Sequence, residues 1–294
     1  MAVTRRSFLQ LVGVTLPRAF ASKETALSAA GALPHPRGGR LGLELYSLRN
    51  ELKRDLPGTL NTVRGWGFEE VELAGLPPMT PDETARALRV AGLRAASAFT
   101  DYERFRDHFA GVVADARTLG LTYLICGWIP HDQMLTRTDV DRAIADFNTW
   151  GAAAVREKLR FAYHIHGYEF LASPDGTLMD TLFKGTDPQS VDYEMDVFWV
   201  VRGGGDPIAL LERHGSRVRL AHLKDIRRGT PTGVPTGQAP DEASVVLGTG
   251  MIDWPALLKA AVKAGVRWYF IEDEHPAASK QIPQSIEYLR RLTL

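Results

Sequence analysis

Short apolar runs alternate with longer amphipathic segments from Arg40 to the C-terminus, and this alternation constrains the fold more than any other feature. Several of these runs are almost continuously apolar, as expected of strands that are buried on both faces. A glycine often stands directly before the next run, where a helix would end. Eight such βα units in about 250 residues predict an α/β protein, a single-domain (β/α)₈ TIM barrel.

The predicted strands cover residues 41–46, 70–73, 93–98, 122–126, 160–164, 191–196, 217–222 and 267–271. Asp206-Pro207 places a capping aspartate and a first-turn proline at the start of one predicted helix. A doubly wound sheet is the competing fold. However, the glycines Gly203, Gly204 and Gly205 lack the spacing of a dinucleotide-binding loop, and they read as a turn before this cap.

The N-terminus has the features of an export signal. Arg5-Arg6 followed by Phe8-Leu9 resembles the twin-arginine motif, and Ala19-Phe20-Ala21 fits a cleavage site. The apolar region between them is too short to span a bilayer, so no stable membrane anchor is expected. We predict a signal over residues 1–22, a linker over 23–39 and the barrel over 40–294, with export to the periplasm by the twin-arginine machinery. A basic amphipathic helix is the alternative.

The charge balance and the cysteine count exclude several classes of partner and site. Lys+Arg and Asp+Glu both number 35, so the sequence shows no basic excess and no nucleic-acid partner is predicted. The single cysteine, Cys126, excludes an internal disulfide and a thiolate metal cage, and its apolar surroundings predict a core residue. The oligomeric state stays open, and a homo-oligomer is compatible with the sequence.

One apolar run ends in His164 and His166, and Glu169 follows three residues later. Residues two apart on a strand point to the same face, so both imidazoles would project together from the strand end. This arrangement is typical of a metal or acid–base site. Two buried histidines bonded to neighbouring carbonyl groups are the alternative.

Other ionisable residues also interrupt or end apolar runs. With the two histidines, the set is Glu72, His164, His166, Asp196, His222 and Glu272. In a barrel these strand ends share one mouth, and buried charges there must pair or hold a cation. Mixed histidine and carboxylate ligands suit Mn²⁺, Fe²⁺, Co²⁺ or Zn²⁺ better than Ca²⁺. We therefore predict a site for one divalent metal ion.

These motifs resemble the xylose isomerase-like TIM-barrel family, a broad group of sugar and sugar-phosphate isomerases and epimerases. The most specific segments are residues 163–170, similar to Y-H-N-H-x-x-E-F, and residues 194–199, similar to E-x-D-x-x-W. Gly205-Asp206-Pro207, His222-Leu223-Lys224-Asp225 and the segment 247–254 add to the likeness, which runs from Leu41 to the C-terminus.

The resemblance implies roles for individual residues. The metal ligands would be His164, Asp196, His222 and Glu272. Either His164 or His166 could be the histidine ligand on that strand, and the other would then contact the substrate. Mn²⁺ is the expected ion, and Zn²⁺, Co²⁺, Fe²⁺ or Mg²⁺ are alternatives. Glu169 and Glu272 would transfer protons. Contacts to a small sugar substrate would come from His166, Lys224, Glu72, Glu44, Trp128, His131 and Trp199. The alternative role of Lys224 is an ion pair with a neighbouring residue. The alternative for Trp199 is a position in the core.

Three departures from the family pattern put the substrate in doubt. Phe99 stands where many relatives carry histidine, Glu44 where glutamine is common, and Glu272-Asp273-Glu274 replaces a more usual E-x-D.

The function implied by the resemblance is a divalent-metal-dependent isomerase or epimerase of a sugar or keto-sugar, working by proton transfer through an enediolate. A sugar lyase or hydratase with the same metal site is the alternative. A phosphodiesterase of the endonuclease IV type would need more metal ligands and a basic surface. A non-catalytic sugar-binding barrel would bind its ligand without turnover.

Overall fold

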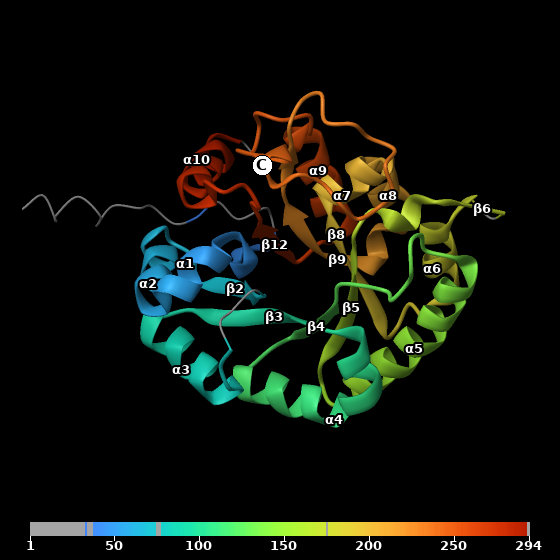
Figure 1. The fold of residues 1–294 in the computed structure, drawn as a ribbon, viewed down its shortest axis with the longest axis horizontal. Coiled ribbons are helices and arrows are strands. Elements are labelled where there is room, and N and C mark those ends of the chain that lie inside the picture. Colours follow the sequence, from blue (N-terminus) through green and yellow to red (C-terminus); the bar gives the residue numbers. More distant parts are fainter. Residues whose placement is uncertain (1–32, 34–37, 75–77, 175, 293–294) are drawn as a thin grey trace, which may run out of the picture.

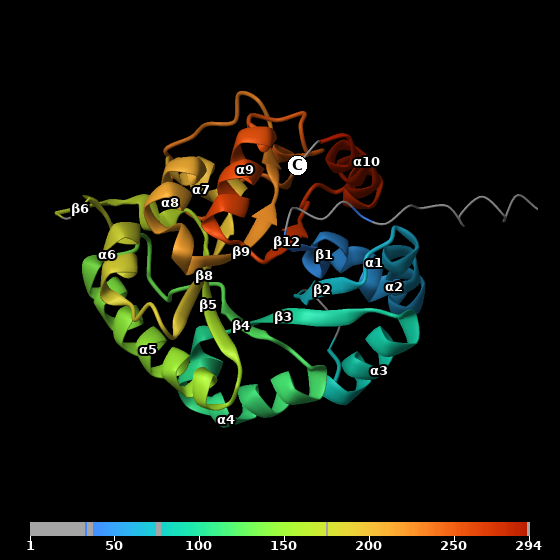
Figure 2. The same cartoon turned by 180° about the vertical axis from the view of Figure 1, so that it is seen from behind.

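The computed structural model describes residues 33, 38–74, 78–174 and 176–292, and its centre is a closed barrel of parallel strands (Figures 1 and 2). The strands follow one another around the barrel in chain order, and β1 pairs with the last strand to close it. They are β1 (Arg40–Glu44), β2 (Glu70–Leu73), β3 (Arg94–Thr100), β4 (Tyr123–Cys126), β5 (Arg160–Ile165), β8 (Val191–Asp196), β9 (Val218–Leu223) and β12 (Trp268–Ile271). The predicted (β/α)₈ barrel is confirmed.

Helices surround the barrel and cover the outer faces of its strands (Figure 1). The α-helices are α1 (Arg49–Arg54), α2 (Leu56–Gly65), α3 (Pro81–Ala91), α4 (Tyr102–Leu119), α5 (Arg137–Arg156), α6 (Leu178–Gly185), α7 (Val197–Gly203), α8 (Pro207–His214), α9 (Trp254–Ala264) and α10 (Ala278–Arg291). Short 3₁₀ turns are η1 (Leu45–Leu48), η2 (Tyr168–Phe170), η3 (Gly215–Arg217) and η4 (Asp241–Ala243). None of the helices in the described ranges is both long and apolar enough to cross a membrane.

Local sequence signals explain where several helices begin. The side chain of Asp206 accepts hydrogen bonds from the backbone of Ile208 and Ala209, which caps α8 as its Asp-Pro start predicts. Thr80 and Glu83 form a capping box at the start of α3. Of the three glycines predicted as a turn, Gly203 is the last residue of α7, and Gly204, in the left-handed region at φ 97°, and Gly205 lead to Asp206.

The first strand is shorter than predicted. It ends at Glu44, because Leu45–Leu48 form the 3₁₀ turn η1 instead of continuing the strand. Leu45 and Leu48 are three residues apart, and a 3₁₀ turn places such residues on the same side, where both are buried here. The chain therefore turns away directly after Glu44, at the mouth of the barrel.

Two layers of apolar side chains form the core. A large cluster fills the space between strands and helices, and it includes Cys126, which is free and buried as predicted. A smaller cluster inside the barrel is built from Ala96, Tyr123, Ile125, Ala162, Leu220 and Phe270. This inner cluster leaves the carboxyl ends of the strands for polar residues.

Asp225 holds the long segment that follows β9. Its Oδ2 accepts hydrogen bonds from the backbone of Gly248 and Gly250 and from Nε1 of Trp254, at 2.8, 3.1 and 2.9 Å. A short hairpin of β10 (Asp225–Ile226) and β11 (Ser244–Val245) forms beside it, and a second hairpin joins β6 (Ala172–Ser173) to β7 (Gly176–Thr177). The segments 222–225 and 247–254, which both carry the family resemblance, are thus held together by the hydrogen bonds of Asp225.

The predicted export signal and most of the predicted linker lie outside the described residues. Both stay predictions.

Candidate active site

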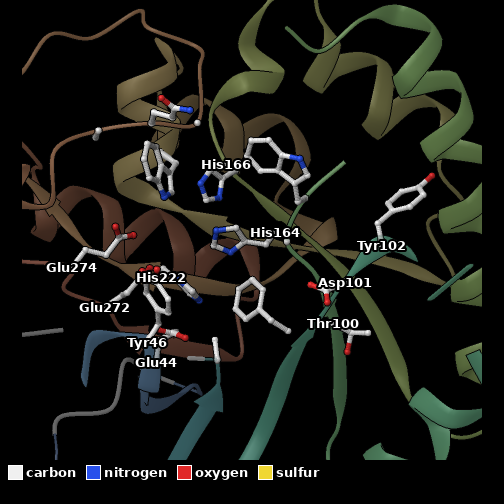
Figure 3. A pocket seen from close by; sticks show the side chains of 18 of the residues that line it. Glu44, Tyr46, Thr100, Asp101, Tyr102, His164, His166, His222, Glu272 and Glu274 are labelled. Atoms are coloured by element: carbon white, nitrogen blue, oxygen red, sulfur yellow. Dashed lines mark hydrogen bonds and ion pairs between the residues drawn. The ribbon is translucent and has the colours of Figure 1, made fainter. Parts of the chain in front are cut away.

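One cavity of about 1010 Å³ opens at the carboxyl ends of the barrel strands. In Figure 3 the side chains of His164, His166, His222 and Glu272 gather at its base. Of the residues predicted for the site, those that line the cavity are Glu44, Trp128, His164, His166, Trp199, His222 and Glu272. Asp196, Glu72, Lys224, Glu169 and His131 lie behind this lining, and their roles differ accordingly.

Ligand atoms of His164, Asp196 and His222 all lie within 4.8 Å of one another. His222 Nδ1 is 2.7 Å from Glu272 Oε2 and 3.8 Å from Asp196 Oδ2. Asp196 caps α7 by accepting a 3.0 Å hydrogen bond from the backbone N–H of Trp199 on Oδ1, whereas its Oδ2 has no hydrogen-bond partner among the described residues. Burial raises the pKa of Asp196 to about 7.

This cluster fits a divalent cation. It offers two imidazole nitrogens and two carboxylates, and the buried Oδ2 of Asp196 accepts no hydrogen bond among the described residues, with His222 Nδ1 and Lys224 Nζ each 3.8 Å away. An unpaired buried carboxylate oxygen is costly, and a bound cation would remove that cost. Burial, and then His222, lower the pKa of His164 well below its usual range, so His164 is the neutral imidazole that a metal requires. The four residues predicted as ligands are therefore brought together, and the identity of the ion stays a prediction.

Two buried glutamates hold the histidines of this cluster from below. Glu194 Oε2 lies 3.0 Å from His164 Nδ1, and Glu72 Oε1 lies 2.6 Å from His222 Nε2. Ser97 in turn donates a 2.5 Å hydrogen bond to Glu72 Oε2. Among the described residues these contacts leave His164 Nε2 without a carboxylate partner, whereas His222 has a carboxylate on each ring nitrogen, Glu72 on Nε2 and Glu272 on Nδ1. Burial would lower the pKa of His222, but Glu194, Glu272 and Glu72 raise it well above its usual range, so a metal at Nδ1 would take the place of a proton there. Glu72 is fully buried, so its predicted contact with substrate finds no support here.

Lys224 forms a buried ion pair, which was the alternative to a contact with substrate. Its Nζ lies 3.1 Å from Glu272 Oε1 and also bonds to Glu274. Burial alone would lower the pKa of Lys224, but Glu272, Glu274 and Asp196 raise it well above its usual range. Burial would likewise raise the pKa of Glu272, yet Lys224 and His222 hold it well below its usual range. Lys224 therefore keeps Glu272 ionised and does not itself reach the cavity.

Glu169 is fully buried outside the cavity lining. Its Oε1 accepts a 2.5 Å hydrogen bond from the Tyr163 hydroxyl and a 3.0 Å bond from the backbone N–H of His166. Gly167 turns the chain at φ 90°, so the glutamate points back under the loop. This placement gives no support to the predicted proton transfer by Glu169. It fixes the backbone of His166, whose side chain lines the cavity.

Aromatic rings form one wall of the cavity. His166 stacks on Trp199 with ring centroids 4.5 Å apart, and Trp128 meets His166 edge to face at 5.6 Å. His131 stacks on Trp128 at 4.7 Å and does not reach the cavity lining. Burial, and then the charge of Lys224, lower the pKa of His166 to about 3. The cavity wall thus consists of Trp128, His166 and Trp199, and His131, a predicted substrate contact, supports it from behind.

Replacing Gly167 by alanine should destabilise the protein, because a Cβ there would lie 2.5 Å from the backbone oxygen of Trp199 and φ is 90°. We expect a loss of about 1–3 kcal/mol in the free energy of unfolding, measured by chemical denaturation. Gly111→Ala is the matched control, since a Cβ at Gly111 in α4 meets nothing within 4 Å. It should be neutral or stabilise by roughly 0.5–1 kcal/mol. Equal effects of both substitutions would contradict the strain at Gly167.

Comparison with known proteins places this site in a family. The family model described as xylose isomerase-like TIM barrel matches residues 62–292. The chain belongs to this family.

Curated relatives and solved structures agree with that assignment. The chain is 23% identical over 297 residues to an inosose dehydratase of Geobacillus kaustophilus, covering 86% of this chain and 94% of that protein. It is 28% identical over 152 residues to an inosose dehydratase of Geobacillus thermodenitrificans, but this match covers only 49% of this chain and 50% of that protein.

Two solved structures share the fold. A sugar phosphate isomerase/epimerase from Parabacteroides distasonis has a TM-score of 0.72 at 24% identity, covering 87% of this chain and 99% of that one. The IOLI protein with a bound zinc atom has a TM-score of 0.65 at 17% identity, covering 86% of this chain and 95% of that one.

Within the family pattern, residues beyond the predicted set also shape the site. Phe99, which replaces a common histidine, packs its ring edge-on against His164 and His222 at 5.2 and 6.1 Å. Glu194 was not assigned a role, although its position two residues before Asp196 on one strand signals a shared face. Glu274 lines the cavity and bonds to Lys224. No spacing rule singles out Glu274, because it follows β12 in a loop.

Proposed function

We propose that this chain is a divalent-metal-dependent lyase that removes water from a keto-polyol or keto-sugar of the inosose type. The observation that carries the proposal is the buried His164/Asp196/His222/Glu272 cluster at the base of a large cavity, in a chain whose curated relatives include inosose dehydratases. This is the lyase alternative from the sequence, and the relatives favour it over the predicted isomerase or epimerase.

His164, Asp196, His222 and Glu272 would hold the ion. Once bound there, the ion would supply Lewis-acid stabilisation of the negative charge that develops on the substrate carbonyl oxygen. Glu272 would accept the proton from the carbon next to the carbonyl, because Lys224 and His222 keep it ionised. His166 would hold a substrate hydroxyl as a neutral imidazole, and the rings of Trp128 and Trp199 would exclude water.

The acidic surroundings of the site bear on the substrate. Besides Glu44, four acidic residues line the cavity against the single arginine Arg104, and Lys224 behind the lining is engaged with two of them. The four are Asp101, Glu103, Glu272 and Glu274. Such a site repels anions, which disfavours phosphorylated sugars and the phosphodiester of an endonuclease IV-type reaction. We therefore propose a neutral polyhydroxylated ketone as the substrate.

The test is to incubate the purified protein with an inosose in D₂O and to follow the products by mass spectrometry and NMR. We expect loss of one water per turnover, abolition of turnover by a chelator, and recovery when Mn²⁺ is added back. An isomerase or epimerase, the second candidate, would give a product of unchanged composition that carries deuterium. Binding without turnover would instead identify a non-catalytic barrel.

A further inference from the structure

Glu44, which the resemblance implies as a substrate contact, has no role so far in the proposed reaction. It is the last residue of β1, and it lies beside Glu72 in the register with β2. On its other side Leu43 pairs with Ile271, the residue before Glu272. The side chain is 1% exposed and lines the cavity near Glu272 and His222 (Figure 3). Glu44 therefore faces the same space as the expected metal ligands.

Neither carboxyl oxygen of Glu44 has a hydrogen-bond partner within the described part of the chain. The neighbouring carboxyl groups differ, since Glu72 bonds to His222 and Ser97, and Glu272 bonds to His222 and Lys224. A buried polar group without a partner costs about 1–3 kcal/mol. A partner for Glu44 has to come from whatever enters the cavity.

The surroundings of Glu44 favour its neutral form. Burial, and then the negative charge of Glu272, raise the pKa of Glu44 well above its usual range, and no cation bonds to it in the described residues. A carboxyl group that is buried without a bonded cation or a hydrogen-bond donor favours its neutral form, and this one lines the cavity that a substrate hydroxyl would enter.

We propose that Glu44 donates the proton to the leaving hydroxyl group in the elimination; this inference rests on the proposed lyase function. The C–H bond next to the carbonyl breaks, its proton goes to Glu272, and its electron pair forms the C=C bond. The C–O bond breaks with its electron pair on oxygen, which takes the Glu44 proton and leaves as water. Atoms and charge balance without an oxidant or reductant, and Glu44 is protonated again from solvent.

The test compares two substrates that differ only in the leaving group: an inosose, and its deoxyfluoro analogue with fluoride at the leaving position. Fluoride departs without being protonated, so it does not need the acid. Glu44→Gln should lower the turnover of the inosose on the order of 10²–10³-fold. With the fluoro analogue the same variant should stay within about threefold of the unmodified protein, and its metal affinity should not change.

Controls separate this role from others. Glu212→Gln changes an exposed glutamate on α8, outside the cavity, and should leave the turnover of both substrates unaffected. Glu44→Ala provides a second variant, in which added formic acid should restore part of the inosose turnover. Equal loss on both substrates, weaker metal binding, or full activity of Glu44→Gln would each overturn the proposal. If the unmodified protein releases neither water nor fluoride, the proposed lyase function fails instead.

Discussion

Replacing Asp196 by asparagine should abolish tight metal binding and turnover while leaving the fold intact. Oδ1 of Asp196 caps α7, and an asparagine oxygen can accept the same hydrogen bond from the Trp199 backbone. The lost group is Oδ2, which accepts no hydrogen bond among the described residues and lies 3.8 Å from both His222 Nδ1 and Lys224 Nζ. We expect metal affinity to fall on the order of 10²-fold or more, since even removal of a group that only positions a ligand costs 10–100-fold.

Isothermal titration with Mn²⁺ and with Zn²⁺, together with metal analysis after dialysis, measures this effect. Asp206→Asn is the matched control, because Asp206 caps α8 with a similar hydrogen bond and does not line the cavity. It should bind metal like the unmodified protein. The same titrations on His164→Ala and His166→Ala decide between the two histidines, and only His164→Ala should lose affinity. Unchanged affinity in Asp196→Asn would refute the ligand assignment.

Much of the architecture was predictable because it depends on local signals. The alternation of apolar runs locates the strands, and the glycines and prolines locate the ends and starts of the helices. In a parallel barrel the carboxyl ends of all strands lie at the same mouth. The convergence of His164, Asp196, His222 and Glu272 follows from these two facts, and the structure brings the four residues together. What the sequence cannot supply is the depth of each side chain below the mouth.

Depth separates the predicted residues that line the cavity from those that lie behind its lining. Glu72 and Glu44 are neighbours in the register of β1 and β2, yet Glu72 lies under His222 while Glu44 lines the cavity. The position of Glu169 depends on the φ of 90° at Gly167, which sends its side chain to Tyr163. Neither outcome can be read from spacing, because each depends on where a strand stops and how the chain turns after it.

Burial also decides the effect of replacing Lys224. Lys224→Met leaves Glu274 without its cation and Glu272 with His222 alone, in a site where Lys224 itself is 1% exposed. Breaking a buried pair by removing one partner costs about 3–5 kcal/mol. At about 2–4 °C per kcal/mol for a chain of this size, the melting temperature of the metal-free protein should fall by roughly 10 °C at pH 8.

The loss of stability in Lys224→Met should depend on pH, because Lys224 lowers the pKa of the two carboxyl groups beside it. In the unmodified protein the pKa of Glu272 is held low, so its contribution to stability is present above its unfolded pKa and is lost as the pH falls. Without Lys224 the pKa of both carboxyl groups should rise, because each loses the charge that lowers it, and protonation at lower pH then relieves their repulsion. The difference in stability between the two proteins should therefore shrink from pH 8 to pH 5.

The control is Arg54→Met, which breaks an exposed pair with Glu51 and should cost no more than about 0.5 kcal/mol at either pH. If Lys224→Met were as mild as this control, the buried pair would contribute nothing to keeping Glu272 ionised.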